Sequence, residues 1–213
     1  MMSRKLLFFG LLVICSTTLV AQRFNAGILA GGNVSQLDGD DKDGYHKFGF
    51  QAGAFVSLKV SPHSSFQLEM EYIQKGSRYN GDSLSLDSTF LFRFHYLEIP
   101  LLYQFSFTKG KRWSIEAGPA MDVLLGAYGE SNHLVIPSGY FSSLRPVTLS
   151  GIFGFSAFIT DHLKANFRFN YSILSIWPEK LYPPTSRHIF FETGQYNNVM
   201  TLSLFWYFKP REQ

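Results

Sequence analysis

An alternation of apolar and polar residues with a period of two constrains this chain more than any other feature. Between Phe48 and Val60 every even position is apolar, and most odd positions are small or polar. Successive side chains of a β-strand point to opposite faces, so this segment predicts a strand with one apolar and one polar face. Its length exceeds that of most globular strands and suits a tilted membrane strand, which crosses a bilayer in roughly 9–11 residues.

The same alternation recurs along the rest of the chain. It predicts seven further strands, at residues 23–33, 66–72, 97–107, 113–125, 147–159, 163–173 and 200–208. Bacterial outer-membrane barrels have an even number of antiparallel strands, so a total of eight matches that class. The sequence therefore predicts an all-β fold, an eight-stranded antiparallel up-and-down transmembrane β-barrel.

Composition excludes two other classes of protein. Hydrophobic residues make up 46% of the chain and charged residues 16%, which gives enough apolar surface to exclude a disordered chain. Beyond the N-terminus no apolar run approaches the roughly 18 residues that a membrane-spanning helix requires.

Charged side chains share the polar faces of the predicted strands. In a membrane barrel the apolar face meets lipid and the charges point into the lumen, whereas a soluble lipocalin-like barrel has the reverse arrangement. Strand length, bulky aromatic side chains and an export signal favour the membrane barrel. Because an isolated buried charge is costly, we expect a lumen network of ion pairs. Its members are Lys59, Glu69, Glu71, Lys75, Glu98, Glu116, Asp122, Lys164 and Arg168.

The N-terminus has the order of a cleavable signal peptide. Arg4 and Lys5 precede an apolar segment at residues 6–14, and small and polar residues lead to Ala21. We expect residues 1–21 to be removed and residues 22–213 to form the barrel domain. The single cysteine, Cys15, would leave with the signal, which excludes disulfides and thiolate metal sites in the mature chain. The net charge of +3 would fall by two, which leaves no basic field for nucleic acid.

The predicted connections alternate between short and long. The short ones are residues 61–65, 108–112 and 161–162, and the long ones are residues 34–47, 79–89, 127–146 and 176–196. Short periplasmic turns and longer extracellular loops are typical of outer-membrane barrels.

Aromatic residues gather where the strands should meet the two membrane interfaces. We expect a periplasmic girdle of Phe105, Phe107, Trp113 and residues 205–208, and an outer girdle of Phe90, Phe92, Phe94, Tyr128, Tyr171 and Trp177. Arg93 and His95 are polar at lipid-facing positions, which predicts either a strand that extends above the membrane or a bulge that exchanges the two faces of this strand.

The long connections carry three candidate sites. Aromatic side chains of the last one predict a partner-binding loop, with Trp177, Tyr182, Phe190 and Phe191 as its contacts. Carboxylates between residues 38 and 44 offer oxygen ligands for Ca²⁺, but the spacing fits an EF-hand poorly and favours a solvated acidic loop. Ser131 with His133, and Ser186 with His188, could form hydrolase pairs with Glu130 or Glu192 as the orienting acid. We expect no catalytic residue, no bound metal and no cofactor.

Four segments resemble one known family in their order along the chain. They are GILAGGN at residues 27–33, EYIQKG at 71–76, YLEIPLL at 96–102 and EAGP at 116–119. Together they resemble the PorT-like outer-membrane β-barrel family of Bacteroidetes-type Gram-negative bacteria. The resemblance implies an eight-stranded barrel in the outer membrane. The member that gives the family its name supports protein export by the type IX secretion system.

These observations predict a non-enzymatic integral outer-membrane barrel that acts as a structural or interaction protein of the cell envelope. Its expected partners are outer-membrane lipid and, through the resemblance, other envelope or secretion-system proteins. A narrow small-solute channel is the first alternative, because an eight-stranded lumen is just wide enough for side chains or a thin polar path. An outer-membrane lipid-modifying hydrolase or acyltransferase is the second.

Overall fold

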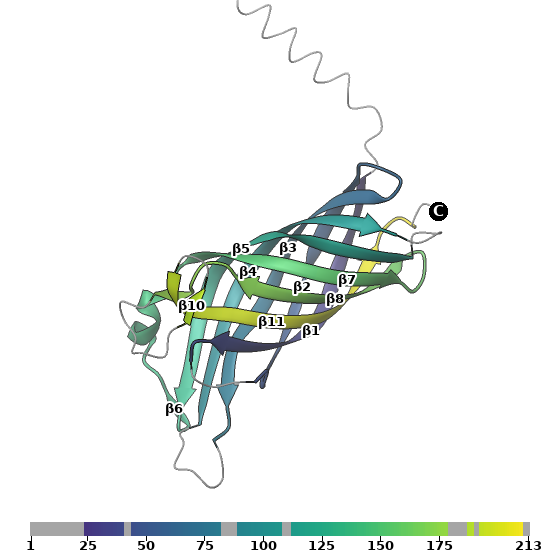
Figure 1. Ribbon diagram of the computed structural model, residues 1–213. Helices are drawn as coiled ribbons and strands as arrows, with labels where there is room; N and C mark the ends of the chain where they lie inside the picture. The colour runs from purple at the N-terminus through teal and green to yellow at the C-terminus, as the bar shows by residue number, and fades with distance from the viewer. Residues whose placement is uncertain are drawn as a thin grey trace, which may run out of the picture.

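Eight long antiparallel strands form a closed ring (Figure 1). The computed structural model describes residues 24–40, 44–81, 89–107, 112–178, 187–189 and 192–210. The predicted signal peptide, residues 1–21, lies outside these residues. The strands of the ring are β1 (Phe24–Asp38), β2 (Lys47–Lys59), β3 (Ser64–Tyr79), β4 (Phe90–Ser106), β5 (Trp113–Ser131), β7 (Val147–Phe158), β8 (Leu163–Ser172) and β11 (Glu192–Tyr207).

The first and last strands close the barrel. Each strand pairs with the next in sequence order, and β11 returns to pair with β1 in a register that runs from Gly27 opposite Tyr207 to Asp38 opposite Tyr196. Closure leaves no strand edge in contact with lipid, where a backbone amide or carbonyl would have no hydrogen-bonding partner. The predicted eight-stranded barrel is thereby confirmed. No helix among the described residues is long and apolar enough to cross a membrane.

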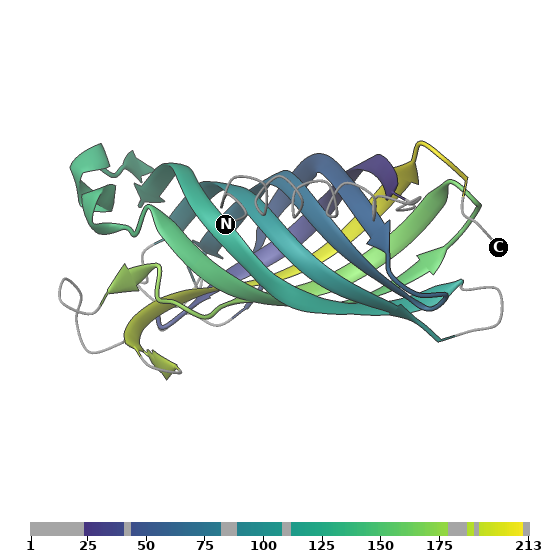
Figure 2. The same cartoon turned by 90° about the horizontal axis from the view of Figure 1, so that it is seen from above.

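The short elements lie at one end of the barrel. They are β6 (Leu134–Val135), the 3₁₀-helix η1 (Ser138–Ser143), β9 (Trp177–Pro178) and β10 (Arg187–Ile189). Figures 1 and 2 place η1 and β10 at the same end, opposite the end of β11 drawn in yellow. We call the end with the long connections the outer end and the other the inner end.

Most strands continue further toward the outer end than the alternation predicts. β1 runs to Asp38 rather than residue 33, β3 runs to Tyr79 rather than residue 72, and β11 begins at Glu192 rather than residue 200. Lipid requires apolar side chains only along the membrane, whereas backbone pairing continues above it. The apolar alternation therefore marks the lipid-facing part of each strand and underestimates its full length.

A β-bulge interrupts the pairing of β4 with β5. His95 pairs with Gly126, while Tyr96 pairs with Leu124, so Leu125 is the additional residue on β5. β4 keeps its alternation, and the buried Tyr96 points inward while His95 points outward. β4 extends to Phe90, in agreement with the first expectation for this region. The expected bulge that exchanges the faces of β4 is wrong, because the bulged residue lies on the neighbouring strand β5.

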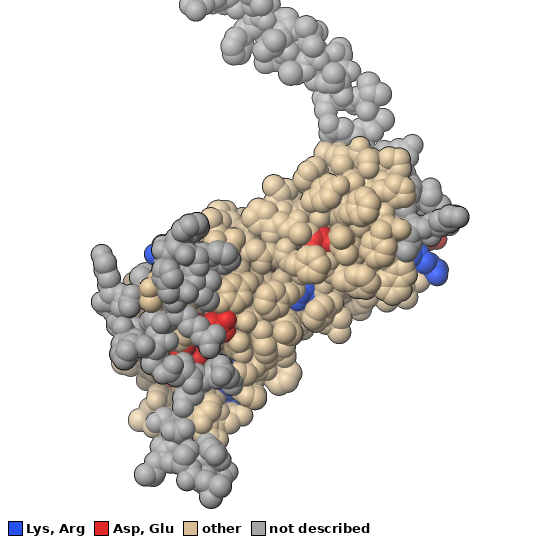
Figure 3. Space-filling model, in the orientation of Figure 1, with Lys and Arg blue, Asp and Glu red and all other residues tan. Residues whose placement is uncertain are grey.

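The outside of the barrel is apolar and the inside is polar. Figure 3 shows the wall as a broad surface that few charged side chains interrupt. Large apolar side chains are exposed on every long strand, and Phe48 reaches 79% exposure. Buried side chains inside include many asparagines, glutamines and serines. This inversion of the soluble pattern is the one that lipid requires.

Four residues of the expected aromatic girdles lie inside the barrel instead. Phe94, Trp177, Phe205 and Tyr207 are buried, whereas the neighbouring Trp206 is 49% exposed. A run of four consecutive aromatic residues in one strand must divide between its two faces, since neighbours point in opposite directions. Phe105, Phe107 and Trp113 are exposed at the inner end, as expected.

Gly27 makes close packing at the seam between β1 and β11 possible. A Cβ atom there would lie 2.0 Å from the Trp206 carbonyl oxygen and 2.6 Å from the Phe55 ring. We expect Gly27→Val to lower the unfolding free energy by at least about 1–3 kcal/mol, because the seam must open to admit the side chain. The measurement is the urea midpoint of the refolded barrel, followed by heat-modifiable gel mobility.

Gly32→Val is the matched control, because the nearest atom to its added Cβ would lie 3.9 Å away. Equal midpoints for the two variants would contradict the role of close packing at the seam.

Candidate functional site

The lumen collects most of the charged residues that the alternation singled out. Eight of the nine are at most 2% exposed: Glu69, Glu71, Lys75, Glu98, Glu116, Asp122, Lys164 and Arg168. Lys59 is only half-buried and is the last residue of β2, at the inner end. The eight buried residues come from β3, β4, β5 and β8, because these strands carry charges at their inward positions.

Arg168 is the centre of the network. Its Nη1 donates to Glu69 Oε2 at 2.7 Å and its Nη2 donates to Glu69 Oε1 at 2.5 Å, which forms a bidentate pair. Its Nε donates to Glu116 Oε1 at 2.5 Å. One guanidinium therefore joins β8 to β3 and β5 across the lumen.

Amide side chains complete the coordination of the carboxylates. Glu116 accepts hydrogen bonds from Gln104 and Asn166, both at 2.8 Å, and Asn170 donates to both oxygens of Glu98. Gln67 donates to Glu69. The predicted lumen network does not include these amides. They occupy inward positions of the predicted strands, so the same alternation that identifies the charged residues also identifies these amides.

Lys75 forms the second centre, nearer the outer end. Its Nζ donates to Asp122 Oδ1 at 2.9 Å and makes an ion pair with Glu98. Glu98 lies opposite Glu71 on β3 and opposite Asp122 on β5, so three carboxyl groups share one row of the barrel. Glu71 has a weaker contact with the Arg168 guanidinium, at 3.9 Å.

Lys164 is surrounded by aromatic rings. Its Nζ lies 4.8 Å from the ring centre of Phe205, 5.5 Å from that of Tyr207 and 6.0 Å from that of Phe158. Aromatic faces attract cations, and the attraction grows when the cation is shielded from water. This lysine therefore joins the charge network to the apolar cluster at the inner end.

Lys47 is a buried cation that sequence reasoning missed, because the predicted strand began one residue later. It is 2% exposed, and its Nζ has no hydrogen-bonding partner in the described part of the chain. Its position two residues before Gly49 and four before the buried Gln51 places it on the inward face of β2.

Apolar clusters close the lumen at both ends. The outer seal consists of Leu37, Ile73, Phe94, Tyr96, Phe141, Leu144, Ile176, Trp177 and Val199. The inner seal consists of Leu29, Phe55, Phe205 and Tyr207, with Phe158 packed against it. Phe141 comes from η1 and Trp177 from β9, so two outer connections fold back over the lumen. The charge network therefore lies between two apolar seals.

The outer seal corrects the predicted partner-binding loop. Trp177 is 2% exposed, and its ring centre lies 6.1 Å from that of Phe92 and 6.1 Å from that of Phe141. It is therefore part of the core. A residue in a long connection can still face inward when that connection folds over a barrel opening. Tyr182, Phe190 and Phe191 lie outside the described residues.

The loop between β1 and β2 is tied to the barrel at both ends of its described part. Tyr171 donates to Asp38 at 2.7 Å, and Ser77 donates to Asp40 at 2.8 Å. Tyr45 donates to Asn198 at 2.7 Å. Burial and, secondly, the Asp38 carboxylate raise the pKa of Tyr45 above its usual value, so its hydroxyl remains a donor. The described residues contain no group of three metal-ligating side chains, and residues 41–43 lie outside them.

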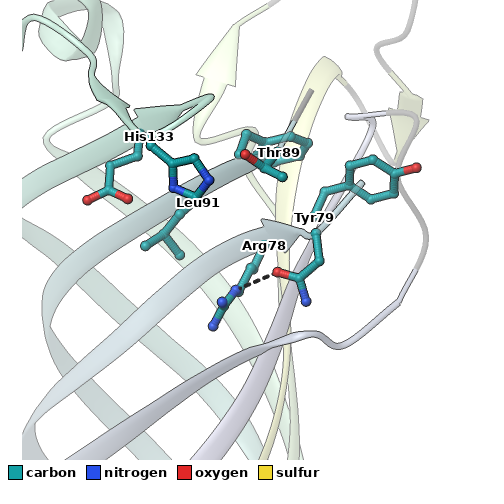
Figure 4. Close-up of a pocket in the computed structure, with 8 residues that line it drawn as sticks. Arg78, Tyr79, Thr89, Leu91 and His133 are labelled. Atoms are coloured by element: carbon teal, nitrogen blue, oxygen red, sulfur yellow. Dashed lines mark hydrogen bonds between the residues drawn. The ribbon is translucent and has the colours of Figure 1, made fainter. Parts of the chain in front are cut away.

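His133 lines a depression on the outer rim together with Arg78, Tyr79, Thr89, Leu91 and three other residues (Figure 4). Arg78 is occupied there by a hydrogen bond to Asn80 at 2.8 Å. Within the described chain no serine hydroxyl is hydrogen-bonded to His133, and Glu130 accepts from Tyr128. Ser186 and the side chains of His188 and Glu192 lie outside the described residues. The structure therefore does not bring a serine, His133 and Glu130 together as a triad.

One family model matches most of this chain, and several solved structures are similar to it. A family model described as outer membrane protein beta-barrel domain matches residues 18–177. The chain is similar to the crystal structure of Ail, the attachment invasion locus protein of Yersinia pestis, at 12% identity and a TM-score of 0.46, over 86% of this chain and 98% of that chain.

Two further solved structures are similar to it. Neisserial surface protein A has 10% identity and a TM-score of 0.46, over 86% of this chain and 96% of that chain. OprG from Pseudomonas aeruginosa has 13% identity and a TM-score of 0.38, over 87% and 94%. No curated protein matches the sequence.

Arg168 should be the most costly charge to remove. We expect Arg168→Met to lower the unfolding free energy by about 3–5 kcal/mol, because Glu69 and Glu116 would remain buried without their cation. Arg78→Met, at an exposed position of β3, should change it by less than about 0.5 kcal/mol. Urea titration of both refolded variants measures the difference, and equal values would show that the network does not stabilise the barrel.

Proposed function

Since this chain belongs to the outer membrane protein β-barrel domain family and resides in the outer membrane, we propose that it acts there as a non-enzymatic structural and interaction protein of the cell envelope. The observation that carries this proposal is the filled lumen. A barrel whose interior is occupied by paired charges and closed by apolar seals must act through its outside surface and its outer end.

The outer end offers a surface for such contacts. The long strands continue beyond the lipid-facing alternation, and β5 and β6 form a hairpin at their tip. Leu134 and Val135 on this hairpin are 73% and 63% exposed. Two adjacent exposed apolar residues above the membrane cannot gain from lipid, so a protein contact is the natural way to remove them from water.

The first alternative, a small-solute channel, receives less support. A solute would have to pass the outer seal around Trp177, the ion pairs of Lys75 and Arg168, and the inner seal around Phe205. The rim hydrolase receives less support as well, because the described residues bring no serine to His133. No contact among the described residues favours either alternative.

A role in protein export rests on the PorT-like resemblance of residues 27–33, 71–76, 96–102 and 116–119. We propose it as a specific form of the envelope role. Export substrates should then remain in the periplasm of cells that lack this protein, and comparing their secreted proteins by mass spectrometry tests the idea. An unchanged set of secreted proteins would remove export while leaving the interaction role in place.

The filled lumen predicts an absence of conductance. In planar bilayers the purified full-length protein should give no reproducible single-channel openings, because paired charges and two apolar seals block the path. A porin added afterwards to the same bilayer serves as the positive control. Discrete, reproducible openings before that addition would favour the channel alternative.

The exposed hairpin predicts which residues hold a protein partner. Crosslinking in intact cells should recover envelope proteins with the native chain, and Leu134→Asp combined with Val135→Asp should reduce their yield at least about fivefold. Ser138→Asp is the control, because it adds a charge at an exposed polar position of the same connection. An undiminished yield from the double variant would exclude the hairpin as the contact.

A further inference from the structure

A polar cluster on the lipid-facing side of β3, β4 and β5 has no part in the lumen network. Along β4 the outward side chains from Phe105 to Leu97 are all apolar or aromatic, and the next two outward residues are His95 and Arg93. Strand residues advance by about 3.4 Å each, so Arg93 lies about 14 Å along the strand beyond Leu97. This is where a wall that contacts acyl chains should reach the lipid headgroups.

We propose that Arg93 and His95, together with the open space over Gly126, bind a phosphate group of an outer-leaflet glycolipid. This inference goes beyond the proposed function, and neither depends on the other. Its three parts are a histidine whose Nε2 is left for an anion, an arginine whose donors are not used, and open space over Gly126 of β5.

A hydrogen bond with the Tyr72 hydroxyl engages Nδ1 of His95 and leaves Nε2 for an anion. Gln74 Nε2 donates to the Tyr72 hydroxyl at 3.0 Å, and that hydroxyl is in turn hydrogen-bonded to His95 Nδ1. With Nδ1 as the acceptor of the Tyr72 proton, a neutral His95 carries its own proton on Nε2, where it can donate to an anion.

Arg93 presents an unused guanidinium on the same face. It stacks on the Tyr128 ring, with 5.9 Å between Cζ and the ring centre. Its side chain makes no hydrogen bond or ion pair within the described residues, and the Glu130 carboxylate on the same face accepts from the Tyr128 hydroxyl instead. Arginine presents paired donors that match the oxygens of a phosphate. The stacking holds this group in place without consuming its donors.

Gly126 leaves room beside these two side chains. It pairs with His95, and Tyr128 pairs with Arg93, so β5 forms the adjacent wall. A Cβ atom added at Gly126 would meet nothing within 4 Å. The bulge at Leu125 gives Gly126 its outward position, because one additional residue exchanges the two faces of β5 beyond that point.

A buried cation lies behind the same wall. The aliphatic part of Lys47 lies 3.3 Å from a Cβ built on Gly76, and Gly76 is the partner of Arg93 on β3. Lys47 Nζ is buried and has no hydrogen-bonding partner in the described chain. Its charge lies on the lumen side of the wall behind Arg93 and favours an anion on the outer side. Glu130 is the acidic group on this face, and Arg78 is a second cation beyond it.

The occupant that fits is a lipid rather than a free anion. The open space lies directly above apolar outward side chains, and Leu125 beside it is 59% exposed. A phosphorylated glycolipid could place its phosphate over Gly126 while its acyl chains cover Leu125 and the apolar row below. A free phosphate would gain only the polar half of these contacts.

Binding of phosphorylated lipid A to the refolded full-length chain tests the proposal. The chain is inserted into phosphatidylcholine nanodiscs, and native mass spectrometry counts the lipid A molecules that it retains. Arg93→Gln and Gly126→Val should each weaken retention about tenfold, because the first removes the charge and the second places a side chain in the space that the phosphate would occupy. Arg78→Gln is the matched control and should bind as the native chain does, since Arg78 is occupied by Asn80.

Lipid A without phosphate separates this site from general attraction to acyl chains. Equal retention of the two lipid A forms, or native retention by Arg93→Gln, would overturn the proposal. Displacement of lipid A by inorganic phosphate at submillimolar concentration would show that the site takes a free anion, which also overturns it. Heat-modifiable gel mobility confirms folding, and if Gly126→Val does not fold, Arg93→Gln decides alone.

Discussion

The structure depends on the pairing of buried charges inside a closed ring of strands. Arg168 holds Glu69 and Glu116 from two other strands, and Lys75 holds Glu98 and Asp122 in the same way. Arg168 joins β8 to β3 and β5, and Lys75 joins β3 to β5 through Asp122, so each cation connects strands that backbone hydrogen bonds do not link directly; the Lys75–Glu98 pair connects the neighbouring strands β3 and β4. An eight-stranded ring is just narrow enough for side chains to meet across it, so the small barrel and the charge network require each other.

The seals at both ends follow from the same constraint. Ion pairs are strongest where water is excluded, and apolar clusters at the openings exclude it. At the inner end Phe205 belongs to the seal and also contacts the charge network, because Lys164 and Arg168 both lie over its ring. At the outer end η1 and β9 supply Phe141 and Trp177, so two connections serve as a cover for the lumen. Together these features support the proposal that the interior is a structural element rather than a passage.

A filled interior moves function to the surface. The wall must be apolar along the membrane, and its chemistry changes where β4 passes from Leu97 to His95 and Arg93. The β4–β5 bulge lies at this boundary, and it allows the outer part of β5 to present a different face. The two proposed contacts, with lipid headgroups at this level and with proteins at the exposed hairpin above it, use separate parts of one surface.

The sequence by itself determined the fold class, the number of long strands and the inward position of most charged residues, because alternation is a local property of each strand. It could not determine which charges meet: Arg168 and Glu69 are 99 residues apart, and their contact depends on how the ring closes. The positions of Trp177, Phe94 and Lys47 were likewise decided by tertiary structure. Trp177 lies in a connection that folds over the lumen. Phe94 lies in the extension of β4 beyond the predicted strand, and Lys47 lies one residue before the predicted start of β2. Alternation assigns a side chain to a face, whereas closure of the barrel decides what that face contacts.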